Sequence, residues 1–175
     1  MQSHPLKNWL IFMGLLAAAV GCATTPPAKE MTPSVATAPA RPGNKTLKVL
    51  PLQEGENYRN NLAKWNIKAD SFQEALVGTL KQTGRFQGVF TSQEGDYLLR
   101  PTLISMDVNF GIPTSIHLLI NYRLVDVSSG KEFWQGNLYS QGTSQWGRGR
   151  ISGAYETAVK NNLSQLAQKL AGLEL

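Results

Sequence analysis

The chain has 175 residues, with 17 Lys and Arg against 12 Asp and Glu, a formal net charge of +5 and a single cysteine. The basic residues do not gather in a run, so a nucleic-acid partner is not expected. One cysteine also excludes an internal disulfide framework.

The N-terminus has the pattern of a lipoprotein signal peptide. Lys7 precedes the apolar run Asn8–Val20, which is too short to span a bilayer but is typical of a signal-peptide core. The run ends in Ala19-Val20-Gly21-Cys22, which resembles the lipobox of lipoprotein signal peptidase. We predict a signal peptide over residues 1–21, cleavage before Cys22 and acylation of its thiol. The alternative is an ordinary secretory signal followed by an incidental cysteine.

The next segment, residues 22–46, is predicted to be a disordered tether behind the lipidated cysteine. It contains five prolines and few large apolar residues, so it cannot bury enough surface to offset its loss of conformational entropy. A flexible chain of this length spans about 25–30 Å. Ala23 occupies the position where Asp is associated with inner-membrane retention, so the outer membrane is favoured, with the domain facing the periplasm.

Residues 47–175 read as a single domain that begins with a strand and a helix. Leu47–Leu52 predicts a strand, and the polar segment 53–61 predicts a loop. Apolar residues recur at helical spacing within 69–83, where Asp70 and Gln73 are spaced as a capping box. Gly84 then suits the end of that helix.

The second half predicts a β-meander and a closing helix. Phe86–Phe90 suits a short strand, and three longer strands follow at Tyr97–Phe110, Ile116–Val127 and Glu132–Gln141, joined by two short loops. An apolar stripe over 153–170 predicts the last helix. The expected fold class is α+β, an antiparallel sheet of about four strands with two amphipathic helices packed on one face.

Three segments carry a resemblance to a known group of proteins: the helix with Gly84-Arg85-Phe86, the strand start Gly95–Leu99, and the hairpin Tyr122–Trp134. This layout resembles the small α/β periplasmic domain of Gram-negative outer-membrane lipoproteins. The curli-secretion, penicillin-binding-protein-activator and ABC-transport-auxiliary lipoproteins share it. The resemblance implies a non-enzymatic accessory role. One departure is Arg100-Pro101 within a strand, since proline cannot donate to a ladder and predicts an edge or a bulge there.

The sequence offers little for catalysis. His117 is the only histidine after the signal peptide, and one histidine without a cysteine cluster makes neither a zinc site nor a Ser-His-Asp triad. Ser128 and Lys131 match a serine–lysine motif only in letters, because they fall in a turn. Gly147–Gly149 lacks the βαβ context of a nucleotide loop. No enzyme activity, metal or cofactor is expected.

Two places stand out as candidate binding sites. The loop Gln141–Arg150 contains Trp146, Arg148 and Arg150, and Trp and Arg are enriched at binding hot spots. Its amides and guanidinium groups also suit an anion, such as an anionic lipid or a glycan. The alternative is a connector whose Trp146 covers the core. Phe110 and Ile112, at the tip of the first long hairpin, form the second candidate.

Two functions remain open from the sequence. The first is a membrane-anchored accessory or scaffold lipoprotein that binds an envelope protein partner. The second is a lipid- or lipopolysaccharide-handling subunit of an envelope transport system, which would need an unfilled apolar groove. Alternating strands suit both.

Overall fold

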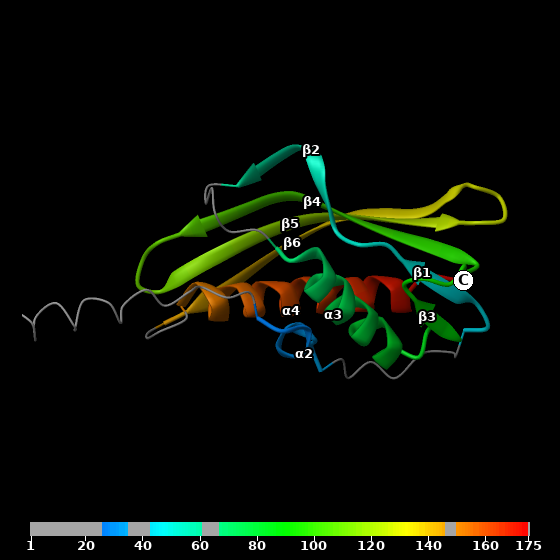
Figure 1. The fold of residues 1–175 in the computed structure, drawn as a ribbon, viewed down its shortest axis with the longest axis horizontal. Helices are drawn as coiled ribbons and strands as arrows, with labels where there is room; N and C mark the ends of the chain where they lie inside the picture. Colours follow the sequence, from blue (N-terminus) through cyan, green and yellow to red (C-terminus); the bar gives the residue numbers. More distant parts are fainter. Residues whose placement is uncertain (1–25, 35–42, 61–66, 146–149, 175) are drawn as a thin grey trace, which may run out of the picture.

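The computed structural model describes residues 26–34, 43–60, 67–145 and 150–174 of the chain. The predicted signal peptide, with Ala19, Val20, Gly21 and Cys22, lies outside these residues. In chain order the elements are α2 (Ala28–Met31), β1 (Thr46–Val49), β2 (Gln53–Asn60), α3 (Ala69–Gln82), β3 (Gly88–Phe90), β4 (Tyr97–Asn109), β5 (Thr114–Asp126), β6 (Glu132–Ser144) and α4 (Arg150–Ala171) (Figure 1). Over the described ranges no helix is long and apolar enough to cross a membrane.

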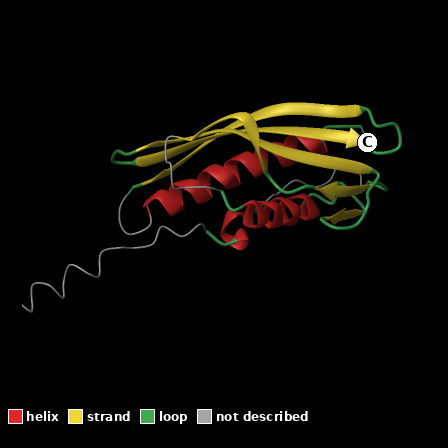
Figure 2. Cartoon of the chain, turned by 45° about the horizontal axis from the view of Figure 1, so that its top comes forward, coloured by secondary structure: helices red, strands yellow, loops and turns green. Residues whose placement is uncertain are grey.

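The fold has two layers, a six-stranded sheet and the helices packed beneath it (Figure 2). The strand order is β3-β1-β4-β5-β6, and β2 also pairs with β4. The pairs β4–β5 and β5–β6 are antiparallel, whereas β1 and β2 pair parallel with β4, and β3 pairs parallel with β1. The α+β prediction is confirmed in outline, but the expected sheet of about four antiparallel strands is wrong. The sheet is larger and mixed.

The meander β4–β5–β6 has one buried face and one open face. Along β5, alternate side chains are fully buried under α4, and the intervening ones point to the opposite face. The stripe of α4 packs on them, as its spacing predicts; its buried members are Tyr155, Val159, Leu163, Leu166 and Leu170. No described helix covers the other face of the sheet, which we call the open face (Figure 1).

Pro101 lies inside the sheet, where the prediction placed an edge or a bulge. It pairs with Tyr122 of β5 on one side. On its other side, the partner of β4 changes from β1, which ends opposite Leu99, to β2, which begins opposite Thr102. Pro101, which has no amide proton to donate, therefore lies between the end of β1 and the start of β2. The bulge occurs three residues later, between Leu103 and Ser105.

Two local predictions for the first half are wrong. The polar segment predicted as a loop is strand β2, because its backbone finds partners on β4. No side chain caps α3; the Gln73 amide instead donates to the Val49 carbonyl at the end of β1, at 2.8 Å. Gly84 does end the helix in a left-handed conformation, with φ 60°.

The segment 26–34 also differs from the predicted disordered tether. Its short helix α2 contacts α3 and α4, and Met31 is fully buried in the core. The flanking prolines lose little conformational freedom on ordering, which lowers the entropic cost of docking so short a helix. Part of the 22–46 segment thus packs on the domain.

The last strand is longer than predicted, because Gly142–Ser144 continue β6 beyond Gln141. Gly142 allows α4 to approach closely: a Cβ there would lie 2.0 Å from the Ala154 carbonyl oxygen. Asn161 and Gln165 of α4 donate to the Gln141 and Tyr139 carbonyls, at 2.8 and 3.0 Å. Helix α4 therefore hydrogen-bonds to the edge strand as well as covering the sheet.

Candidate functional site

The β4–β5 tip and the described ends of the Gln141–Arg150 loop lie at one end of the molecule, which we call the hairpin end. It comprises the β4–β5 tip Phe110–Pro113, the end of β6 and the start of α4. Thr114, at the start of β5, pairs with Ser144, at the end of β6. The loop between β6 and α4 therefore begins beside the tip. Trp146 and Arg148 lie outside the described residues, as does the side chain of Arg150, the first residue of α4.

The tip exposes two large apolar side chains. Phe110 is 67% exposed and Ile112 is 63% exposed, more than the other exposed large hydrophobic residues of the described part of the chain. The Thr114 hydroxyl donates to the Gly111 carbonyl at 3.2 Å, which closes the turn. The tip thus holds its apolar side chains away from the core that the rest of β4 and β5 build.

His117 lies just behind the tip on the open face. Asn109 Nδ2 and Ser115 Oγ donate to its Nε2, at 3.2 and 3.3 Å. Because an amide nitrogen can only donate, Nε2 is the acceptor, and the ring proton on Nδ1 is donated to the Tyr139 hydroxyl. His117 points away from the buried face, as the sequence predicted. It is half-buried and hydrogen-bonded there.

This cluster does not have the layout of a catalytic triad. Asp107 is directly opposite His117 in the register, but the imidazole bonds Asn109, Ser115 and Tyr139 in place of that carboxylate. Among the described residues, no group of His, Cys, Asp and Glu could hold a metal ion. What the cluster does chemically is to orient the Tyr139 ring, which is 54% exposed.

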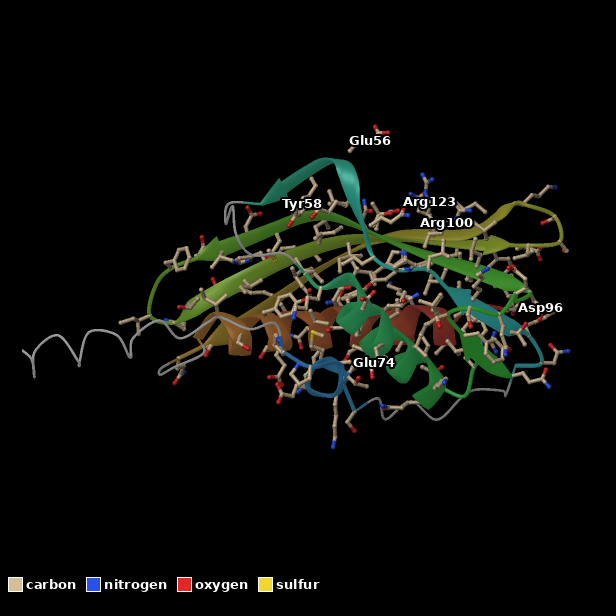
Figure 3. The ribbon with its side chains drawn as sticks, viewed as in Figure 1. Glu56, Tyr58, Glu74, Asp96, Arg100 and Arg123 are labelled. Atoms are coloured by element: carbon tan, nitrogen blue, oxygen red, sulfur yellow. The ribbon has the colours of Figure 1, made fainter. Side chains whose placement is uncertain are left out.

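Farther along the open face, two arginines face each other. Arg100 of β4 is directly opposite Arg123 of β5 (Figure 3). Arg123 lies 3.5 Å from a Glu132 carboxylate oxygen, and Arg100 makes no ion pair with another described residue. Like charges directly opposite each other on neighbouring strands are destabilising. The pair therefore creates a local positive field on a face that no described helix covers.

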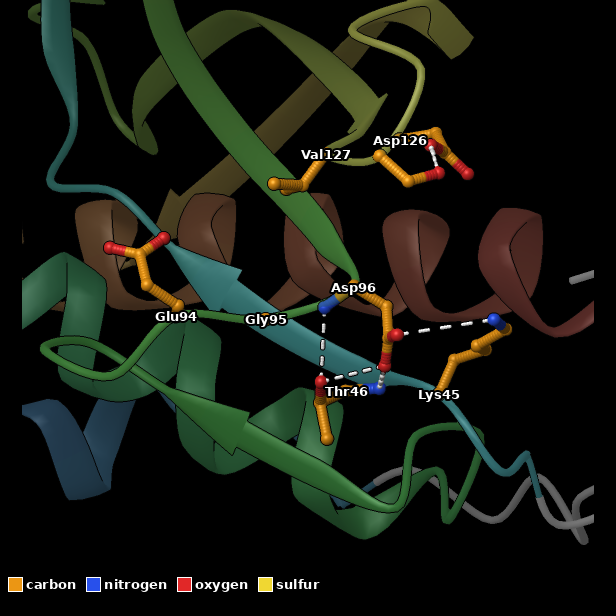
Figure 4. Close-up of a pocket in the computed structure, with 8 residues that line it drawn as sticks. Lys45, Thr46, Glu94, Gly95, Asp96, Asp126 and Val127 are labelled. Atoms are coloured by element: carbon orange, nitrogen blue, oxygen red, sulfur yellow. Dashed lines mark hydrogen bonds and ion pairs between the residues drawn. The ribbon is translucent and has the colours of Figure 1, made fainter.

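The opposite end of the molecule carries a polar pocket of about 390 Å³, lined by Lys45, Thr46, Glu94, Gly95, Asp96, Asp126, Val127 and Ser128 (Figure 4). Asp96 Oδ2 accepts from the Thr46 amide at 2.7 Å and from its hydroxyl at 2.8 Å. These hydrogen bonds lower the pKa of Asp96, and the bond from the Thr46 amide has the largest effect. The pocket joins the start of β1 to the start of β4.

Asp126, on the same pocket, organises the β5–β6 turn. Its Oδ1 accepts from the Ser128 hydroxyl and from the Ser129 amide, at 2.6 and 2.8 Å. These hydrogen bonds lower the pKa of Asp126 to about 2, and the bond from the Ser128 hydroxyl has the largest effect. Both pocket aspartates therefore have structural partners, and Gly130 follows with φ 67°, as the turn requires.

The sequence predicted apolar residues at the tip, where the structure exposes them, and named no candidate on the open face. Phe110 and Ile112 stand out because apolar residues in a turn have no core to enter. The His117–Tyr139 contact and the Arg100–Arg123 pair depend on cross-strand register. Alternation within one strand gives the face of each residue but not its neighbour.

No family model matches this sequence, and a comparison with curated proteins finds no relative. Solved structures share the fold. Protein XCC0632 from Xanthomonas campestris, of the family model DUF330, is similar with a TM-score of 0.59 at 14% identity, over 78% of this chain and 87% of that one. PelC from Paraburkholderia phytofirmans, solved as a dodecamer, has a TM-score of 0.51 at 18% identity, over 73% and 92%. Lipoprotein GNA1162 from Neisseria meningitidis is similar at a TM-score of 0.45 and 17% identity, over 70% and 98%. At these identities the similarity to XCC0632 and to PelC establishes the fold alone.

Proposed function

We propose that the chain is a membrane-anchored accessory lipoprotein of the bacterial envelope that presents the open face of its sheet to a protein partner. Two independent features support the two halves of this proposal. The lipobox-like sequence before Cys22, the only cysteine, supports the anchor. The uncovered sheet face, with its facing arginines, supports the partner.

The Arg100–Arg123 pair is the observation that carries the partner. Glu132 offsets the charge of Arg123, but Arg100, directly opposite, makes no ion pair with another described residue, so the repulsion is only partly compensated within the chain. Carboxylates of a partner would relieve the repulsion through charge-assisted hydrogen bonds, which arginine makes well because its donors form a planar fork. Tyr139, held by His117 on the same face, adds an exposed aromatic ring. Arg and Tyr are two of the residue types enriched at hot spots.

The proposed role is not catalytic. The side chains of His117, Asp96 and Asp126 form hydrogen bonds with neighbouring strands and turns. These bonds support a structural use of the titratable groups.

The loop between β6 and α4 stays a second proposed contact. Trp146, Arg148 and Arg150 suit either a protein partner or an anionic lipid or glycan, as their composition predicts. The outer membrane is the proposed location, on the basis of Ala23. The pocket at the far end is lined mainly by charged and polar residues, which supports partner binding more than lipid handling.

The anchor is tested by replacing Cys22 with Ser in cells given labelled palmitate. We expect loss of labelling, accumulation of the uncut precursor and release of the chain from the membrane. Unchanged labelling would contradict acylation of Cys22. Sucrose-gradient separation of inner and outer membranes tests the location, and co-migration with inner-membrane markers would contradict the outer-membrane proposal.

The partner is tested with the anchored protein and an Arg100→Gln/Arg123→Gln variant. After cross-linking in cells, we expect a partner to be recovered with the wild type and lost with the variant. The matched control is Lys81→Gln/Lys169→Gln, which removes the same charge from exposed positions on the helices and should retain the partner. Equal recovery with all three proteins would contradict docking on the open face.

A further inference from the structure

We infer that the β4–β5 tip is a second membrane contact: Phe110 and Ile112 enter the interfacial region of the bilayer that holds the lipid anchor. This inference rests on the proposed acylation of Cys22, and it concerns a partner, the lipid surface, that the open face does not address. Three observations carry it: the chemistry of the tip, the docking of α2, and the side of α2 on which the described residues before it lie.

The tip is suited to an interfacial environment because it brings no charge with it. From Val108 to Ile116 the chain contains no charged residue, and the two tip side chains are mostly exposed. Pro113 has no amide proton, and the Gly111 carbonyl accepts from Thr114, so fewer backbone groups need water. Aromatic side chains favour the membrane–water interface, and aliphatic ones favour the region just below it.

The docking of α2 shortens the link to the membrane. Had residues 22–46 been a free tether, the domain would hang about 25–30 Å from its anchor. Instead Pro26 is buried, and Met31 is buried against α3 and α4. The residues from 22 to 26 span at most about 14 Å when fully extended. An acylated Cys22 therefore holds the surface near α2 close to the lipid headgroups.

The hairpin end is the end that this link brings to the membrane. In Figure 1 the described residues before α2, drawn in blue, lie on the side of α2 toward the β4–β5 hairpin, whereas the β5–β6 turn lies at the far end of the molecule. The tip and the anchor therefore reach the same surface. The polar pocket, with its two aspartates, then faces away from the lipid.

A bilayer fits this patch better than a protein does. Two side chains on one narrow turn make a contact far below the area of about 1,000 Å² that a specific protein interface needs. A bilayer requires no complementary pocket, and the anchor makes insertion an intramolecular step at high effective concentration. The tip need not bind membranes alone, because it acts as the second of two linked contacts.

The test uses the mature acylated protein in vesicles of phosphatidylethanolamine and phosphatidylglycerol. Because acylation consumes the Cys22 thiol, an introduced cysteine is the only free one. Ile112→Cys places a spin label at the tip, and Lys131→Cys places the matched label in the exposed β5–β6 turn. We expect the label at 112 to lose collisions with a water-soluble nickel chelate and to gain collisions with oxygen, while the label at 131 stays accessible to nickel. Phe110→Cys replaces Ile112→Cys if that variant fails to fold.

The outcomes separate this inference from the proposed function. If intact-mass measurement shows an unmodified Cys22, the anchor and the insertion are both overturned. An acylated protein whose label at 112 is as accessible to nickel as the label at 131 overturns the insertion alone. A label at 112 that is protected from nickel and from oxygen alike also overturns it, since that pattern means burial against a protein or a second copy of the chain.

Discussion

Asn162 of α4 lies at the centre of a buried hydrogen-bond network, and its removal offers a test of the packing between α4 and the sheet. Its Oδ1 accepts from the Tyr122 hydroxyl at 2.7 Å, and its Nδ2 donates to the Leu138 carbonyl at 2.9 Å and to Ser140 Oγ at 3.2 Å. Burial raises the pKa of the Tyr122 phenol, so the hydroxyl remains a donor.

The cost of Asn162→Ala follows from these bonds. The substitution leaves the Tyr122 hydroxyl buried without its acceptor, which costs about 1–3 kcal/mol. The vacated amide volume adds to this cost, because a packed interior collapses only partly. We expect the free energy of unfolding to fall by about 3 kcal/mol, and the melting temperature to fall by about 6–12 °C for a chain of this size.

The assay is urea unfolding followed by circular dichroism on a soluble Cys22→Ser form that starts at residue 22. Asn161→Ala is the matched control: the neighbouring amide donates to the Gln141 carbonyl from an exposed position, and its loss should cost under about 1 kcal/mol. A cycle with Tyr122→Phe should show a coupling of about 1–2 kcal/mol, because the double variant leaves neither partner of this bond orphaned. If the two substitutions add to within about 0.5 kcal/mol, the Tyr122–Asn162 bond does not form in solution and the reasoning is refuted.

Five further variants test other parts of the chain. Gly142→Ala should lower the thermal midpoint by overpacking worth about 1–3 kcal/mol, because its Cβ would meet the backbone of α4; an unchanged midpoint would contradict the close approach. Met31→Ala should cost about 2–5 kcal/mol in urea unfolding if α2 stays docked, and a cost near zero would mean that this segment is free. The pKa of Asp126 is lowered to about 2 in the folded chain, so its contribution to stability is present above the unfolded pKa of about 4 and is lost as the pH falls toward 2. Asp126→Asn should flatten this acid dependence of stability. Identical stability-against-pH profiles for the variant and the wild type would refute the prediction. Trp146→Ala should weaken the free energy of partner binding by about 2 kcal/mol if Trp146 is a hot spot. If Trp146 covers the core, the same variant should lower the free energy of unfolding by about 3–5 kcal/mol, and binding and melting measured together decide between the two. Arg148→Ala combined with Arg150→Ala should leave the free energy of unfolding within about 0.5 kcal/mol of the wild type.

The elements with strong periodicity could be predicted from the sequence. Every second residue of β5 from Ile116 to Leu124 is apolar or aromatic, and α4 repeats apolar residues at helical spacing, so each has one face that must be buried. The buried face of β5 is the predicted one, and so is the stripe of α4. Strand β2 has no such signal, because Gln53–Asn60 is almost entirely polar. It is a strand because β4 offers backbone partners beyond the end of β1, a tertiary effect that no local pattern records.

The Arg100–Arg123 pair shows why a site residue escaped prediction. Counting back from the hairpin tip with an uninterrupted register places Arg100 opposite Leu124, on the buried side. The bulge between Leu103 and Ser105 adds one residue to β4 and shifts the pairing, so Arg100 meets Arg123 on the open face. Buried residues of β4 accordingly change from even to odd positions, as in Met106 and Leu103. The sequence contains this change of parity, but its consequence for neighbours appears only in the paired sheet.

The bonds from α4 to the edge strand have a consequence for biosynthesis. Strand β6 is an edge thirteen residues long, and an unprotected edge of that length is a template for aggregation. Its protection is the last element of the chain, so a polypeptide that emerges from its N-terminus completes the sheet before α4 is available. A nonsense mutation near Arg150 would release a nearly whole sheet with its apolar face and its edge both bare. Such a product should accumulate as insoluble material or be degraded, and truncation within α4 should be tolerated worse than the distance of α4 from the open face suggests.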